Sequence, residues 1–144
     1  MRMRIWRGAG LKEINEMPWG DIEWEPWQES VAKDLNLLPT GQDFGIINAD
    51  EMRVPEFISY FQAYSAPSDS WAWEELADLV LQSVSDAMVA GILTEPQKQE
   101  VESILVNDRF KFPNQFEYWK EFPNEEGSYP VADLVRLVAE REGI

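Results

Sequence analysis

The chain has 144 residues, the length of a single domain, and carries 27 acidic against 12 basic residues. The net charge of −15 argues against binding to nucleic acid or an anionic membrane, because both kinds of binding usually need an electropositive surface. With neither Cys nor His, the sequence excludes disulfides, thiol nucleophiles, Ser-His-Asp catalysis and the common structural zinc sites. We therefore expect no metal or organic cofactor.

The first ten residues, MRMRIWRGAG, carry charge, but no apolar segment of the kind found in signal peptides follows them. No uncharged apolar run approaches the ~18–20 residues that a membrane span needs. The sequence therefore predicts a cytoplasmic protein that does not bind membranes.

Two short strands and one helix are predicted in the N-terminal third. Apolar and polar residues alternate over residues 1–6, which favours a strand, and residues 43–48 form a second candidate. Between the two strands, apolar residues recur at helical spacing on a stripe made of Trp24, Trp27, Val31, Leu35 and Leu38.

Helices are predicted for most of the remaining chain. Apolar spacing indicates a helix over 54–64, a longer one from the cap Ser70 to Gly91, a third opened by the capping box at 94–97, and a last one from Pro130. The aromatic segment 110–122 is predicted to be short and broken by Pro113 and Pro123. The expected fold is mainly α, a compact multi-helix single domain over 1–144, with the two N-terminal strands as a minor element.

The segment Trp19–Trp27 interleaves three tryptophans with carboxylates. Such a pattern could bind sugar rings and cleave a glycosidic bond with two acids. Because large aromatic side chains are mostly buried, a place in the helix core is the favoured interpretation for Trp24 and Trp27.

Charge is concentrated in the middle of the chain. Residues 34–97 hold eleven acidic residues and one basic residue, Arg53, and so carry −10 of the net −15. A charge run is usually a solvated face, but one sign of charge at this density is also typical of a surface that binds a basic partner. On the long helix and its start, the predicted partner-binding residues are Asp69, Trp71, Glu74, Glu75, Asp78 and Asp86.

These features favour a non-enzymatic protein that binds and inhibits a basic partner. The example in view is a bacterial immunity protein, whose carboxylates stand in for the phosphates that a cationic toxin nuclease would bind. The likeness is one of size and charge, with no motif behind it, and the sequence leaves the oligomeric state open. One alternative is an adaptor that binds a peptide or helix in an aromatic groove lined by Tyr60, Tyr64, Trp71 or Phe112. A second is a carboxylate-based hydrolase, either magnesium-dependent or of the glycoside type.

Overall fold

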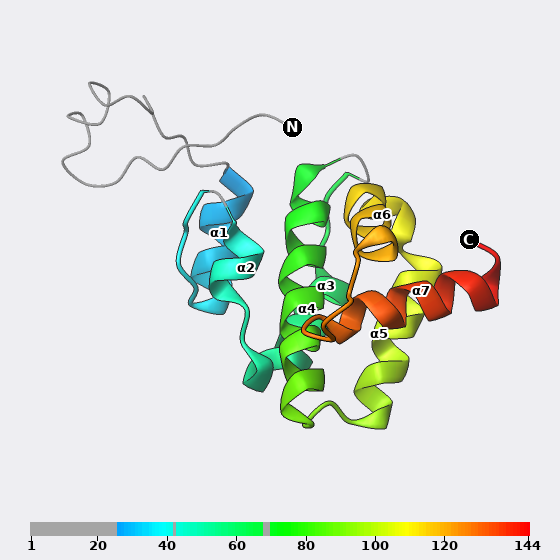
Figure 1. The fold of residues 1–144 in the computed structure, drawn as a ribbon. Helices are drawn as coiled ribbons and strands as arrows, with labels where there is room; N and C mark the ends of the chain where they lie inside the picture. The colour runs from blue at the N-terminus through cyan, green and yellow to red at the C-terminus, as the bar shows by residue number, and fades with distance from the viewer. Residues whose placement is uncertain (1–25, 42, 68–69) are drawn as a thin grey trace, which may run out of the picture. The chain divides into compact units, whose positions relative to one another are not determined.

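A computed structural model describes residues 26–41, 43–67 and 70–144 and divides the chain into two compact units, with the boundary between Asn48 and Ala49. The described residues are mainly α-helical and contain no strand, which confirms the predicted fold class (Figure 1). The strand predicted over residues 1–6 lies outside the described residues. The expectation of a single domain over 1–144 stays a prediction.

The first unit holds two helices, α1 (Pro26–Leu35) and α2 (Phe44–Asn48). The strand predicted over 43–48 is wrong, because those residues form α2 instead. Phe44 and Asn48, four residues apart, are buried, whereas Ile46 and Ile47 are both more than half exposed. A strand would have placed adjacent residues on opposite faces, so this burial pattern fits only the helix.

Two buried side-chain amides hold the loop between α1 and α2. Gln28 donates from Nε2 to the carbonyl of Gly41 at 3.2 Å and accepts from its N–H at 2.8 Å. The Asn48 side chain makes the same pair of bonds with Leu38. It accepts from the Leu38 N–H at 2.9 Å and donates to the Leu38 carbonyl at 2.8 Å. Because a buried main-chain polar group without a partner is costly, these amides satisfy loop main-chain groups at the points where the loop meets the two helices.

The second unit contains η2 (Glu51–Arg53), α3 (Val54–Ala63), α4 (Trp71–Ala90), α5 (Glu95–Asn107), η3 (Arg109–Lys111), α6 (Pro113–Glu121) and α7 (Pro130–Glu142). The long helix α4 contacts η2, α3, α6 and α7 (Figure 1). It begins at Ser70, whose hydroxyl accepts from the N–H of Ala72, and ends at Gly91 in the left-handed conformation. Both ends agree with the sequence prediction.

Aromatic side chains fill the core where α3, α4 and η3 meet. Phe61 packs edge-on against Trp73 at 5.2 Å between ring centroids and against Phe112 at 5.8 Å. All three side chains are almost completely buried. Phe112 was expected to line a surface groove, and that expectation is wrong, because the ring belongs to this core.

The later helices match the sequence except at α6. The Thr94–Gln97 capping box forms, and α5 buries Val101, Ile104 and Leu105 as expected. Pro113 was read as a break, yet it opens α6, since the first turn of a helix does not use the N–H that proline lacks.

We expect Gly91→Ala to lower the free energy of unfolding by about 1 kcal/mol, because Gly91 has φ of 73° and an L residue is strained there. An added Cβ would meet no atom within 4 Å, so the cost comes from the backbone alone. Urea unfolding measures it, with Gly91→Asn as the milder control, since Asn tolerates this conformation. Equal stability of Gly91→Ala and the parent would contradict the assignment.

Candidate functional site

The structure does not give the predicted partner-binding residues one open face. Asp69 lies outside the described residues, Asp86 is exposed, and Trp71, Glu75 and Asp78 are partly buried. Glu74 is only 5 % exposed. Glu74 was expected on the solvent side of this helix, and that expectation is wrong. Helix α4 is buried on most of its circumference because η2, α3, α6 and α7 all contact it.

Glu74 is used inside the protein. Its two carboxylate oxygens accept hydrogen bonds from the main-chain N–H groups of Asn114 at 2.9 Å and Gln115 at 2.8 Å. These groups belong to the first turn of α6, whose own capping residue, Phe112, makes no side-chain cap bond. The carboxylate thus supplies a cap from 40 residues away and places negative charge at the positive end of the helix dipole. This makes Glu74 a structural residue and removes it from the partner-binding set.

Trp71 lies beside a surface cavity of about 360 Å³. The indole N–H is shielded from solvent and has no hydrogen-bond partner among the described residues. The cavity is lined by Ser70, Trp71, Glu74, Phe110, Lys111, Pro113 and Asn114. The cavity therefore lies next to Trp71, the predicted aromatic anchor, but the Trp71 indole nitrogen is not accessible to solvent.

Asp78 lies close to the aromatic end of α6. Its side chain accepts a long hydrogen bond of 3.4 Å from Gln82. The pKa of the Tyr118 hydroxyl is raised above its usual value, first by burial, then by the negative charge of Asp78 and by Tyr129. Asp78 and the tyrosines of α6 and of the following loop therefore belong to one neighbourhood.

Asp86 is the one predicted carboxylate on α4 that is both described and exposed. No ion pair or hydrogen bond to its carboxylate is found within the described part of the chain. Partial burial raises its pKa above the usual value for an aspartate. Among the described residues, no cation therefore offsets this charge.

The groove proposed for an adaptor does not form as predicted. Phe112 is in the core, while Tyr60 and Tyr64 pack against each other at 5.8 Å and Tyr64 packs edge-on against Trp73 at 5.2 Å. Tyr64 thereby joins the wall of the aromatic core, with Tyr60 packed against it.

The carboxylates of the described residues do not gather into a metal site: no group of three or more is placed to hold an ion. Glu74 and Asp78, one helical turn apart, have separate roles, since Glu74 binds α6 and Asp78 lies near Tyr118. Within the tryptophan-rich segment, only Trp27 has a described side chain; it packs edge-on against Phe44 at 5.7 Å. No described helix is long and apolar enough to cross a membrane.

The aromatic segment 110–122 was noted in the sequence without a functional role, and its end forms an aromatic cluster with Tyr129. Tyr118, Phe122 and Tyr129 surround Trp119 at centroid distances of 5.1, 5.4 and 6.1 Å. Trp119 is fully buried, whereas Tyr118 and Tyr129 are 52 % and 41 % exposed. The sequence signal for this cluster is three aromatic residues at 118, 119 and 122, followed by the acidic loop that contains Glu125 and Glu126.

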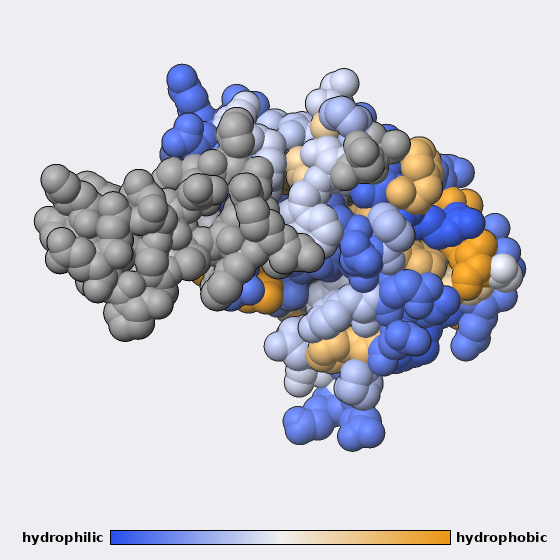
Figure 2. All heavy atoms as spheres, turned by 90° about the horizontal axis from the view of Figure 1, so that it is seen from above, coloured by the Kyte–Doolittle hydropathy of each residue, from blue (hydrophilic) through white to orange (hydrophobic). Residues whose placement is uncertain are grey.

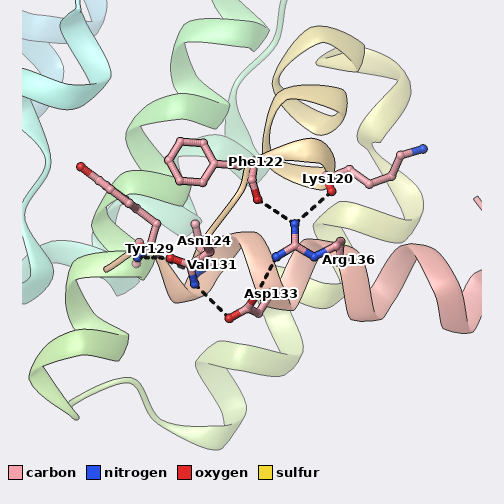
Figure 3. A network of polar contacts seen from close by, with 8 residues as sticks. Lys120, Phe122, Asn124, Tyr129, Val131, Asp133 and Arg136 are labelled. Atoms are coloured by element: carbon pink, nitrogen blue, oxygen red, sulfur yellow. Dashed lines mark hydrogen bonds and ion pairs between the residues drawn. The ribbon is translucent and has the colours of Figure 1, made fainter. Parts of the chain in front are cut away.

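A network of polar contacts fixes this corner between α6 and α7 (Figure 3). Arg136 on α7 donates to the carbonyls of Phe122 at 2.7 Å and Lys120 at 3.3 Å and pairs with Asp133 at 2.7 Å. Asn124 closes the loop by accepting from the N–H of Tyr129 at 2.8 Å. The guanidinium thereby satisfies carbonyls at the negative end of α6 and holds the aromatic cluster in place.

The chain matches no protein-family model, no curated protein and no solved structure. The assignment of function therefore depends on the residues described above.

We expect Glu74→Ala to destabilise the protein by about 2–3 kcal/mol, because two amides at the start of α6 lose a charged acceptor in a buried position. Glu74→Gln should cost less, since one oxygen remains as an acceptor. Glu100→Ala, which removes the same charge from an exposed position on α5, is the control and should cost much less. Hydrogen exchange of the Asn114 and Gln115 amides should rise in Glu74→Ala; unchanged exchange would show that the cap is not formed in solution.

We expect Asp86→Asn to stabilise the protein at pH 7 and to have little effect at about pH 3, below the usual aspartate pKa. A raised pKa means that the folded state binds the proton more tightly than the unfolded state. The contribution of Asp86 to stability therefore improves as the pH falls through its folded pKa towards 3.8, its ordinary value. Thermal melts of both proteins across this range measure the effect. A difference in Tm that is the same at both ends of the range would contradict it.

Proposed function

We propose that this chain is a non-enzymatic acidic domain that binds and inhibits a basic protein in the cytoplasm, as bacterial immunity proteins do with cationic toxin nucleases. The observation that carries the proposal is the charge of the second unit. Residues 49–144 hold nineteen acidic and seven basic residues, a net charge of −12. A field of this strength attracts a basic partner over a distance of about a Debye length, roughly 8–10 Å at physiological salt.

The few cations of this unit are largely occupied by its own carboxylates. Five of the seven form ion pairs at 2.7 to 3.5 Å: Arg53, Lys111, Lys120, Arg136 and Arg141. Four of the five have a partner within a few residues on the same element or at its edge. Each ion pair uses one acid and one base, so pairing leaves the net charge of −12 of this unit unchanged.

The surface also has the composition of a binding face. On the face shown in Figure 2, hydrophilic residues predominate, and hydrophobic residues form small patches between them. Exposed aromatic side chains include Phe110, Tyr118 and Tyr129. Charges of this kind increase the rate of association, whereas aromatic anchors slow dissociation, so the two together suit an inhibitor.

One observation favours a second candidate, the peptide-binding adaptor. Phe110, 61 % exposed, borders both the 360 Å³ cavity at Trp71 and a neighbouring one of about 530 Å³ lined by Arg109, Phe116 and Ile144, among others. An apolar side chain of a peptide could enter beside Phe110. Binding there would be largely insensitive to salt, which separates this candidate from the first.

The test begins with the partner, isolated from the native host by cross-linking to the full chain and then purified. We expect association to slow about tenfold or more between about 0.05 M and 0.5 M NaCl, while dissociation changes little, because screening acts on the encounter. Surface plasmon resonance measures both rates. A salt-independent association rate would overturn the inhibitor and favour the adaptor.

Asp86→Lys and Glu140→Lys form a matched pair for the same measurement. Both change the net charge equally, and both sites are exposed. Asp86 belongs to the predicted partner-binding set. Glu140 does not, and it lies near the C-terminal end of α7. We expect Asp86→Lys to slow association more than Glu140→Lys; the reverse order would remove Asp86 from the binding surface.

A further inference from the structure

Tyr118, Phe122 and Tyr129 form a surface that we call the tyrosine patch. Phe122 and Tyr129 lie 5.1 Å apart between ring centroids, and Tyr118 and Phe122 lie 5.6 Å apart. The rings are held at angles by the buried Trp119, so each tyrosine keeps about half of its surface in solvent. Aromatic surface that stays exposed on a rigid support is typical of an interaction site.

Carboxylates border the tyrosine patch on two sides. Glu125 and Glu126 are exposed in the loop between Phe122 and Tyr129, which Asn124 closes by its bond to the Tyr129 N–H. On the other side lies Asp78 of α4, close enough to influence the ionisation of Tyr118. The patch therefore combines exposed aromatic rings with negative charge.

The cations of the described residues that lie over an aromatic ring lie over rings outside this patch. Arg53 lies over Phe57 at 4.9 Å, and Lys111 lies over Trp73 at 4.4 Å. Lys120, on the same helix as Tyr118, lies towards Phe116 at 5.8 Å. In the part of the chain that the structure describes, no cation covers Tyr118, Phe122 or Tyr129. The nearest guanidinium, on Arg136, binds main-chain carbonyls and Asp133.

We propose that the tyrosine patch binds an arginine side chain of the basic partner, with the guanidinium stacked on the tyrosine rings and paired with the carboxylates of Glu125 or Glu126. This inference rests on the proposed function and names the part of the partner that the surface recognises. Arginine fits better than lysine because its planar, weakly hydrated guanidinium stacks on aromatic rings and pairs with carboxylates through two N–H groups. A lysine ammonium, compact and strongly hydrated, would gain less.

The direct test is a titration of the full chain with two nine-residue peptides of equal charge, one with three arginines and the other with three lysines. Aromatic NMR spectra report the ring resonances of Tyr118 and Tyr129. We expect saturable shifts of both rings with the arginine peptide and binding about threefold or more weaker with lysine. Equal affinity for the two peptides, or shifts confined to other aromatic rings, would overturn the proposal.

Ring variants separate stacking from simple charge attraction. We expect Tyr118→Leu with Tyr129→Leu to weaken arginine-peptide binding about fivefold, the size of an exposed cation–π contact. Tyr118→Phe with Tyr129→Phe keeps the rings and should retain the affinity. Phe110→Leu, an exposed ring on η3, is the control and should have no effect. Loss of binding in the Phe pair equal to that in the Leu pair would overturn the stacking.

A charge pair keeps the failure of this inference distinct from that of the proposed function. Glu125→Gln with Glu126→Gln, and Glu100→Gln with Glu140→Gln, remove the same charge from exposed positions. Only the first pair should weaken the arginine peptide more than twofold. If both pairs weaken it equally, the general field binds basic peptides and the tyrosine patch is not the site. If neither peptide binds the parent chain at low salt, the patch and the basic-partner function both fail.

Discussion

The second unit depends on one buried carboxylate. Glu74 joins the middle of the chain to its last third, because its two oxygens hold the first amides of α6. A short helix of nine residues with no cap of its own would otherwise begin with unsatisfied donors in a crowded region. Glu74 holds the start of α6 and Arg136 holds its end, and the aromatic cluster lies at that end.

Several carboxylates of this strongly acidic chain have a role in the folded structure. Some carboxylates are structural, such as Glu74 at α6 and Asp50, which caps the turn at Met52. Others are neutralised by nearby cations, for example Glu56 by Arg53 at 2.8 Å. Asp86 has neither role among the described residues, and partial burial raises its pKa.

Local signals predicted the fold well and the site poorly. Ser70, Gly91 and the Thr94 capping box act within a few residues, so the sequence alone located the ends of α4 and the start of α5. The burial of Glu74 could not be predicted this way, because it depends on a helix 40 residues further along the chain. The prediction that Phe112 lines a surface groove was wrong for a similar reason. Its neighbours in the aromatic core, Phe61 and Trp73, come from other helices.

The amides of Gln28 and Asn48 have an evolutionary consequence. Both bind main-chain atoms of the loop that they support. A substitution at the exposed Leu38 therefore leaves these hydrogen bonds in place, whereas Gly41 is restricted by its φ of 78°. Among diverged relatives, substitutions should accumulate at Leu38 while both amides and the glycine persist, so this spacing would serve as a signature of the first unit.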